Sequence, residues 1–325
     1  MKPSLESLLA LCRVADRALV EAHCARLDER YFDAFAPEAV AAHLDSLALV
    51  TPEHPIEVRI DARPDGAWVC TVLAFDYPAE FSLIAGVLTG LGFSIDAGLV
   101  FTWRPAPPLP PQARTAGGRR PAVVPDPLRR RRIVDQVVGR AVFEGAAAAW
   151  QAEVRTRLTE VIGLLERGDA EANAWARHRV NEAVARRLGE APAGELPLLY
   201  PMQIEFPGGH DPYTTLRVVS QDTPAFLYAL STALALQRLS IEQVRIRTGR
   251  DGRIEDEIDV LDDAGQPIAD PARRDQIALA ILLTKQFTHF LGQAPDPYTA
   301  LCRFDQLLDD VLRLPARGRL SQSTH

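Results

Sequence analysis

The feature that most constrains the fold is a segment that occurs twice. Residues 54–102 align without a gap with residues 200–248, which lie 146 positions later. Self-similarity over such a length indicates two copies of one supersecondary unit, stacked so that each buries an apolar face. The chain has 325 residues, which exceeds the usual size of a single core. The sequence therefore predicts a duplicated module.

Each copy begins with a strand pair that leads into a helix. Residues 56–60 and 202–206 alternate apolar and polar side chains, which is the period of a strand with one buried face. The next strand ends at an Asp-x-Pro turn, residues 76–78 in the first copy and 222–224 in the second. Proline has no amide hydrogen and fits the first turn of a helix, so we expect a strand to end and a helix to begin there.

Two more strands and two more helices complete each copy. The predicted strands are residues 94–102 and 133–138, then 240–248 and 254–260, and the predicted helices are about 143–166 and 170–189, then 271–291 and 298–313. The fold class is therefore α+β, with two ferredoxin-like antiparallel sheets, helices on one face of each sheet, and a helical segment at the N-terminus. The predicted units are residues 1–53, 54–190 and 196–325.

The last two strands of the second copy pose a question of register. A two-residue Asp-Gly loop would place Ile246 opposite Glu257, although paired residues share a sheet face. An odd loop instead pairs Val244 with Val260 and Ile246 with Ile258. We predict the odd loop. It places these ion pairs on the outer face: Arg245–Asp259 and Arg247–Glu257.

The outer faces of the two predicted sheets differ in polarity. The second copy presents Arg245, Arg247, Glu255, Glu257 and Asp259, whereas the first presents Leu99, Phe101, Val134, Gln136 and Val138. A charged face is stable in water, but an apolar face of that size is usually covered. We expect the N-terminal helices or a second subunit to cover it, and a homodimer is predicted.

Two segments lie outside the repeat. In residues 1–53, Ser4 should cap a helix that runs to Val20, and Pro37 should begin another. Residues 104–132 hold eight prolines and eight arginines, so we predict that the insert at 104–130 is disordered. The run of arginines at 129–132 could contact phosphates, but a solvated linker is the favoured interpretation in an acidic chain.

Composition and motifs exclude several classes of function. The formal net charge of −7 argues against nucleic acid as a partner, and there is no apolar run long enough to span a membrane. The four cysteines (Cys12, Cys24, Cys70 and Cys302) form no CxxC pair, which suits a reducing cytoplasm and no zinc site. Nucleotidyltransferase, Walker, dinucleotide and hydrolase motifs are absent from the sequence. We therefore expect a cytoplasmic non-enzyme with no catalytic residue, metal or cofactor.

The order of elements around each Asp-x-Pro turn resembles the ACT domain, a small α+β module of regulatory proteins. The resemblance rests on residues 76–79 with 92–95, and on residues 222–225 with 239–241. Residues 248–268 resemble the ACT repeats of PII uridylyltransferase. Residues 285–308 resemble the region that follows two ACT domains in some glutamine-synthetase adenylyltransferase-related proteins. The chain departs from the ACT pattern at Ala79 and Ala225, where glycine is usual, and at Ser94 and Ser240, where asparagine is usual.

The resemblance implies a regulatory protein of nitrogen or amino-acid metabolism that senses an amino acid. The ligand would lie where an Asp-x-Pro turn meets a strand of the neighbouring module, with Asp76 and Asp222 holding its ammonium group. Each aspartate could instead simply cap its helix. The implied binding residues are Asp76, Tyr77, Ala79, Phe81, Ser94, Ile95, Asp222, Thr223, Ala225, Leu227, Ser240 and Ile241. The alternative is a ligand-free interaction module that acts in trans on an adenylyltransferase-like enzyme or on glutamine synthetase.

Overall fold

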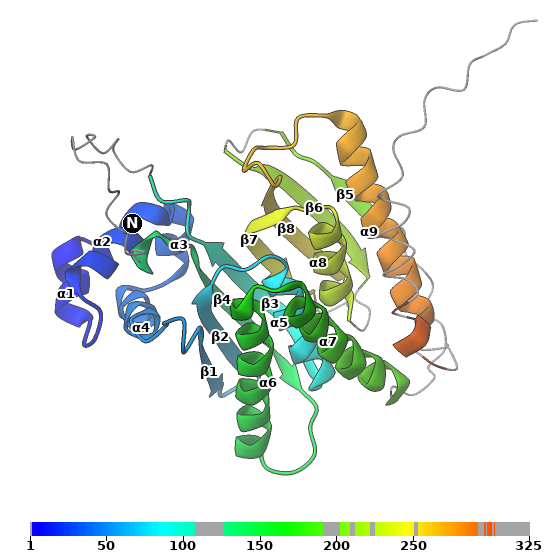
Figure 1. Cartoon of the computed structure of the whole chain (residues 1–325), viewed down its shortest axis with the longest axis horizontal. Coiled ribbons are helices and arrows are strands. Elements are labelled where there is room, and N and C mark those ends of the chain that lie inside the picture. Colours follow the sequence, from blue (N-terminus) through cyan, green and yellow to red (C-terminus); the bar gives the residue numbers. More distant parts are fainter. Residues whose placement is uncertain are drawn as a thin grey trace, which may run out of the picture.

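The strands of both copies form a single sheet (Figure 1). The structure, a computed structural model, describes residues 2–107, 127–190, 202–208, 212–221, 225–249, 253–291, 296, 298–300 and 302. The strands are β1 (Ile56–Ala62), β2 (Trp68–Phe75), β3 (Phe93–Thr102), β4 (Arg132–Ala141), β5 (Gln203–Glu205), β6 (Thr214–Gln221), β7 (Ser240–Arg247) and β8 (Arg253–Leu261). The eight strands are antiparallel to their neighbours in the order β1-β2-β4-β3-β7-β8-β6-β5. The α+β class is confirmed, but the two predicted sheets are continuous.

The two copies join through β3 and β7. In this pairing Leu99 lies opposite Arg245, and the flanking pairs are Ala97 with Arg247 and Phe101 with Gln243. Leu99 and Arg245 are also equivalent positions of the repeat, 146 residues apart. A residue paired with its own equivalent marks a local two-fold relation between the copies. The first strands of the copies, β1 and β5, therefore occupy the two outer edges of the sheet.

Helices of the repeat cover one face of the sheet. They are α5 (Glu80–Gly90), α6 (Ala147–Arg167) and α7 (Ala170–Glu190) in the first copy, and α8 (Phe226–Leu236) and α9 (Pro271–Leu291) in the second. Their apolar side chains and the facing side chains of the strands form one buried cluster that includes Val72, Val137, Val218 and Ile258. Helices α5 and α8 contact each other across the join. One core thus spans both copies.

A glycine allows helix α5 to approach its neighbours closely. A Cβ atom on Gly86 would lie 2.2 Å from Cγ1 of Val180 in α7 and 2.8 Å from Cδ2 of Tyr228 in α8. We expect Gly86→Ala to lower the free energy of unfolding by about 1–3 kcal/mol through overpacking. Gly163→Ala in α6 is the matched control, because its Cβ would meet no atom within 4 Å. The control should gain about 0.5–1 kcal/mol of helix stability. Urea unfolding of both variants measures the difference, and equal stabilities would contradict it.

The N-terminal helices pack on the opposite face of the sheet, to the left in Figure 1. They are α1 (Leu5–Leu11), α2 (Arg17–Arg26), α3 (Glu29–Ala34) and α4 (Pro37–Leu47). Ser4 caps α1 and Pro37 begins α4, as predicted, but the helix expected to reach Val20 is interrupted. The Asp45 carboxylate accepts hydrogen bonds from the amides of residues 13–15 at 2.8–3.0 Å, and Asp16 then caps α2. These caps satisfy the backbone groups that a continuous helix would have paired.

The N-terminal helices cover the apolar outer face of the first copy. Leu73, Phe101, Trp103 and Val134 of the sheet lie in one buried cluster with Leu8, Val20, Tyr31, Val40 and Leu44 of the helices. This cluster is separate from the core on the other face. Of the two predicted ways to cover this face, the chain therefore uses its own N-terminal helices.

Two buried histidines make the N-terminal helices sensitive to acid. His23 accepts a hydrogen bond from Nε1 of Trp103 at 3.1 Å, and Nδ1 of His43 lies 2.9 Å from the hydroxyl of Tyr31. Burial lowers the pKa of His23 to about 3 and that of His43 to about 4. Both values lie below the pKa of about 6.5 expected in the unfolded chain, so unfolding takes up protons and stability falls as the pH drops below about 6.5.

We expect His43→Gln to flatten this dependence. Between about pH 6.5 and pH 4 the slope of the unfolding free energy against pH should fall by about 1.4 kcal/mol per pH unit, because one proton is no longer taken up. His54→Gln is the control, since the His54 side chain is 51 % exposed. Urea unfolding at several pH values gives the slopes. An unchanged slope for His43→Gln, or an equal change for His54→Gln, would contradict the prediction.

The hairpin of the second copy has the predicted parity and a different register. Val244 pairs with Ile258 and Arg245 with Glu257, and a bridge joins Thr248 to Ile254. The loop is therefore odd, but the strands are displaced by two residues from the predicted pairing. Asp259, predicted on the solvated face, is 4 % exposed. Its carboxylate accepts a hydrogen bond from the Thr215 hydroxyl at 2.6 Å and pairs with Arg30 of α3 at 2.7 Å.

Candidate functional site

The first Asp-x-Pro turn lies where β2 ends and α5 begins. The residue that follows it, Ala79, caps α5 with a φ of 65°, and the equivalent Ala225 caps α8 with a φ of 60°. This left-handed conformation costs a residue with a Cβ roughly 1–2 kcal/mol and is easiest for glycine. The same strained backbone thus occurs at the same position of both copies. Such strain persists where the surrounding structure imposes it, and it is common at functional sites.

A β-bulge lies near the start of each of the strands that join the two copies. The pairing of β3 with β4 shifts at Asp96, and the pairing of β7 with β8 shifts at Glu242. Asp96 and Glu242 are equivalent positions, 146 residues apart. A bulge bends a strand and redirects a side chain. In β7 the redirected side chain, that of Glu242, is almost fully buried at 2 % exposure.

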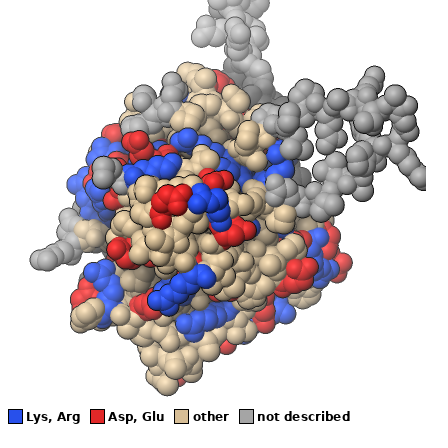
Figure 2. Space-filling view, turned by 90° about the vertical axis from the view of Figure 1, so that its left-hand side faces the viewer, with Lys and Arg blue, Asp and Glu red and all other residues tan. Residues whose placement is uncertain are grey.

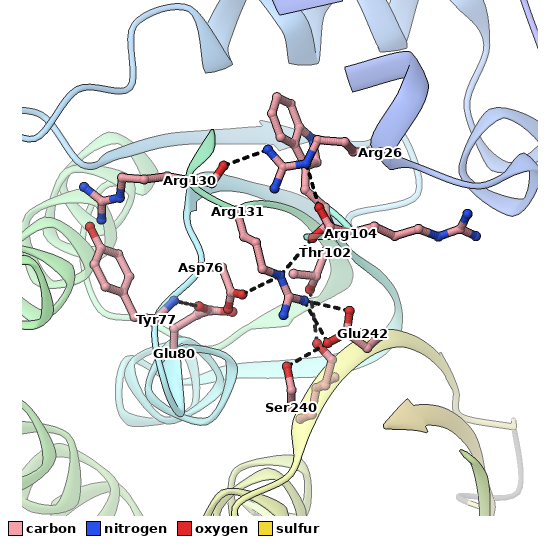
Figure 3. Close-up of polar contacts among 12 residues, drawn as sticks. Arg26, Asp76, Tyr77, Glu80, Thr102, Arg104, Arg130, Arg131, Ser240 and Glu242 are labelled. Atoms are coloured by element: carbon pink, nitrogen blue, oxygen red, sulfur yellow. Dashed lines mark hydrogen bonds and ion pairs between the residues drawn. The ribbon is translucent and has the colours of Figure 1, made fainter. Parts of the chain in front are cut away.

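The turn of the first copy meets the bulge of the second copy through an arginine (Figure 3). Nε of Arg131 lies 3.0 Å from Oδ2 of Asp76, and its Nη2 lies 2.6 Å from Oε2 of Glu242. Nε also donates to the backbone carbonyl of Trp103 at 2.8 Å. The Ser240 hydroxyl donates to Glu242 at 2.7 Å. We call this arrangement of Asp76, Arg131, Ser240 and Glu242 the first corner.

The carboxylates of the first corner hold the arginine in its charged form. Burial opposes a charge on Arg131, but Asp76 and Glu242 raise its pKa nonetheless. One guanidinium is thus bound by two carboxylates, one from each copy of the repeat. Charge-assisted hydrogen bonds of this kind are among the strongest in proteins.

Two further carboxyl groups lie behind the first corner. Glu80 accepts a hydrogen bond from the amide of Tyr77, and Asp135 lies in β4 with 1 % exposure. Burial, with the neighbouring charge of Asp76, raises the pKa of both Glu80 and Asp135 well above the usual range. Both groups are therefore held toward their protonated forms. Because a protonated carboxyl group carries no charge and needs no counter-ion, Arg131 is left to pair with Asp76 and Glu242.

The arginines at 130–132 are held by side chains of the folded structure, and Arg132 is buried. Arg130 lies with Cζ 3.6 Å from the ring centroid of Phe75, and Arg132 lies 5.3 Å from the same ring and 5.5 Å from that of Trp103. Arg26 is 4.7 Å from the Trp103 ring. Arginine stacks well on aromatic faces, and the contact is stronger when water is excluded. The interpretation of this run as a solvated linker was wrong, because the aromatic partners come from distant strands.

Arg26 holds the two ends of the insert together. It donates to the carbonyls of Arg104 and Leu128 at 2.6 Å each, and to that of Arg130 at 3.1 Å. Burial lowers the pKa of this guanidinium to about 10, and neighbouring arginines contribute. Residues 104–107 and 127–130 are thus placed by the fold. The rest of the insert predicted to be disordered, residues 108–126, lies outside the described residues.

The predicted binding residues divide between the two ends of the β3–β7 join. Asp76, Tyr77 and Ala79 lie at the same end as Ser240 and Ile241, since the Thr102 hydroxyl donates to the Ile241 carbonyl at 3.1 Å. The remaining described residues are Ser94 and Ile95 at the start of β3, Ala225 at the cap of α8, and Phe81 and Leu227, which pack against the core from α5 and α8. Asp222 and Thr223 lie outside the described residues.

The contacts that the structure shows among the predicted residues lie at the first turn, and Ser94 is far from that end of β3. Ser94 is eight residues from Thr102 along β3, roughly 26 Å at the rise of an extended strand. The phenol of Tyr77 donates to Glu166 of α6, so this predicted ligand contact is already engaged. The Asp76 carboxylate is also engaged, because it forms an ion pair with Arg131.

Sequence reasoning missed Glu80, Arg131 and Glu242. Glu80 follows the Asp-x-Pro-Ala pattern directly, and this adjacency was the available signal. Arg131 was hidden inside a run of like residues that usually indicates solvated chain. Glu242 lies on a strand whose alternation gave no sign of the bulge, because a bulge is visible only in the pairing with a neighbour.

The surface charge, the placement of metal-ligating side chains and the apolar length of the helices bear on the functions open to the described residues. Acidic and basic side chains are interspersed on the face that carries the N-terminal helices (Figure 2). In the described ranges, no group of three or more His, Cys, Asp or Glu side chains is arranged to hold a metal ion. None of the helices in this part of the chain is long and apolar enough to cross a membrane.

The chain was compared with protein-family models, with curated proteins and with solved structures. None of the three comparisons found a match.

Proposed function

We propose that this protein is a non-catalytic regulator that senses an amino acid through two ACT-like modules. The observation that carries the proposal is the first corner, where the turn of one module meets the bulged strand of the other. In an ACT domain the ligand is expected at this junction. The positive φ of Ala79 and Ala225 adds support, because ACT domains usually have glycine at this position.

The edge strands also fit an ACT-like unit. In each module, the second, fourth and third strands follow one another across the sheet, and the extra first strand takes the outer edge. The second strand of each half runs into the helix that follows the turn. The amides at the N-terminus of that helix would offer donors to a ligand carboxylate.

The second turn is the better candidate for ligand binding. Residues 133–138 align with residues 254–259, so Gly252 occupies the sequence position equivalent to Arg131. Arg131 pairs with Asp76, whereas the sequence offers no arginine at the equivalent position for Asp222. We therefore propose that Asp222 holds the ammonium group of the ligand, with Asp96 as the equivalent of Glu242.

A thermal-shift screen of the twenty amino acids, including glutamine, tests this function. A ligand at a hundred times its dissociation constant should stabilise the natural chain by about 2.7 kcal/mol. The shift should be lost in Asp222→Asn and kept in Asp76→Asn, because the first corner is filled by Arg131. No shift with any amino acid, or a shift that both variants keep, would count against amino-acid sensing at the second turn.

A ligand-free interaction protein is the second candidate. The occupied first corner favours it, because Asp76 and Glu242 already have their cationic partner within the chain. Such a protein would act in trans on an adenylyltransferase-like enzyme or on glutamine synthetase. Affinity purification of the tagged chain should then recover one of these partners. Recovery of neither, together with a measured amino-acid affinity, would reject this alternative.

The proposed homodimer can be tested separately. The edges of β3 and β7 pair within one chain, so this contact leaves neither edge free for a second copy. A dimer would have to use another surface. Sedimentation velocity at several concentrations distinguishes a monomer from a dimer.

A further inference from the structure

We propose that the first corner is a guanidinium-binding site whose resting occupant is the chain's own Arg131. The inference goes beyond the proposed function, which places the amino-acid ligand at the second turn: it names the class of cation that the first corner accepts and the contact that keeps this corner closed. In the natural chain the corner is filled, and a ligand with a guanidinium group can enter only when Arg131 is absent. Three features of the described residues support this assignment.

The first feature is the chemistry of the groups that face Arg131. They are Oδ2 of Asp76, both carboxylate oxygens of Glu242, and the carbonyl oxygen of Trp103. All of these atoms are hydrogen-bond acceptors. Guanidinium has only donors, fixed in a plane, and its geometry matches several acceptors at once. The corner is therefore complementary to a planar cation.

The second feature is that the acceptors are positioned independently of Arg131. Glu242 is at the bulge of β7, is 2 % exposed, and accepts from the Ser240 hydroxyl at 2.7 Å. Thr102 holds the adjacent Ile241 carbonyl at 3.1 Å. Asp76 is set by the turn after β2. Because strands and a turn hold these groups, removal of one side chain should leave the site largely preformed.

The third feature is the limited supply of competing cations. Among the residues that the structure describes, Arg131 is the basic side chain within ion-pair distance of both Asp76 and Glu242. The neighbouring arginines have other partners: Arg130 pairs with Glu166 at 2.8 Å, and Arg26 donates to backbone carbonyls. Arg104 donates to the Tyr213 hydroxyl at 3.3 Å and lies 3.8 Å from Asp28, and these groups, with a smaller contribution from Glu242, raise its pKa. A vacated corner would therefore keep two carboxylates without a directly bonded cation.

Chemical rescue of Arg131→Ala tests the proposal. Guanidinium chloride at low millimolar concentration, far below the molar range in which it denatures, is added to the full-length variant, with sodium chloride at equal ionic strength as the reference. The midpoint of thermal unfolding should rise saturably with guanidinium or ethylguanidinium. It should not rise saturably with tetramethylammonium, which has no donor. The natural chain should show no saturable rise.

Arg245→Ala is the matched control. Arg245 also pairs with a carboxylate, Glu257 at 3.0 Å, but both side chains are nearly half exposed and neither belongs to the corner. Its unfolding midpoint should not respond to guanidinium. If Arg131→Ala does not fold, Arg131→Gln keeps most of the side-chain length without the charge and takes its place in the same titration.

The outcomes separate this inference from the proposed function. A saturable rise confined to the Arg131 variant supports the guanidinium site, whatever the amino-acid screen of the natural chain shows. No rise in the variant, or an equal rise in the natural chain or in Arg245→Ala, overturns it. In that case a positive amino-acid screen would still support sensing at the second turn.

Discussion

Arg131→Met is expected to lower the free energy of unfolding by about 3 kcal/mol. Removing one partner of a buried ion pair leaves the other charge without compensation, which typically costs about 3–5 kcal/mol. The lower end applies because Arg131 and Asp76 are 23 % and 20 % exposed, although Glu242 is only 2 % exposed. Denaturant unfolding measures the change.

A double-mutant cycle assigns this loss to the corner. Arg131→Met combined with Glu242→Gln should be less destabilised than the sum of the two single variants, because the second change removes the uncompensated charge. Arg245→Met is the control. Its ion pair with Glu257 is exposed and should contribute about 0–1 kcal/mol. Additive losses in the cycle, or an equal loss for Arg245→Met, would show that the ion pair of Arg131 with Glu242 does not account for the lost stability.

Trp103→Ala is expected to lower the free energy of unfolding by about 3–5 kcal/mol, as is typical for a large aromatic residue in a core. Trp103 is fully buried, and its indole donates to His23 at 3.1 Å. Cζ of Arg26 lies 4.7 Å from the centroid of the Trp103 ring, and Cζ of Arg132 lies 5.5 Å from it. Removal of the ring would thus loosen the N-terminal helices and the two ends of the insert together.

Hydrogen exchange can locate this loss. The cluster that holds Trp103 is separate from the core shared by the helices of the repeat. Amides of α2 and α4 should therefore exchange faster in Trp103→Ala, while those of α8 and β6 keep their protection. Trp175→Ala is the control. Its side chain is 48 % exposed on α7, and its loss should cost about 1 kcal/mol or less. A uniform loss of protection across the chain would contradict a local role for Trp103.

Local patterns gave most of the secondary structure because they depend on near neighbours. The Asp-x-Pro turns predicted where a strand gives way to a helix, and α5 does begin at Glu80, two residues after Pro78. Alternation predicted an odd hairpin loop, since a side chain cannot change sheet faces without a shift of one residue. It did not predict the register, because displacements by two residues keep every side chain on the same face.

The candidate site was only partly predictable for a related reason. Asp76 and Ser240 were predicted from the motif, and the structure places them at the same end of the join. Arg131 reaches them from the far end of an insert, and its sequence context is that of a solvated linker. The ion pair with Glu242 depends on a bulge and on the pairing of two modules. Neither leaves a pattern in the sequence near these residues.

The sequence by itself determined the duplicated module, the order of its strands and helices within the described residues, and the polarity of each sheet face. These follow from periodicity and turn chemistry, which act over a few residues. The last predicted helix, about residues 298–313, lies almost entirely outside the described residues. Only the tertiary structure decided that β3 and β7 join the modules into one sheet, that the N-terminal helices cover the apolar face, and that Arg131 fills the first corner. Each of these depends on which distant surfaces bury the most apolar area and pair the most charge, and that choice is made by the whole chain.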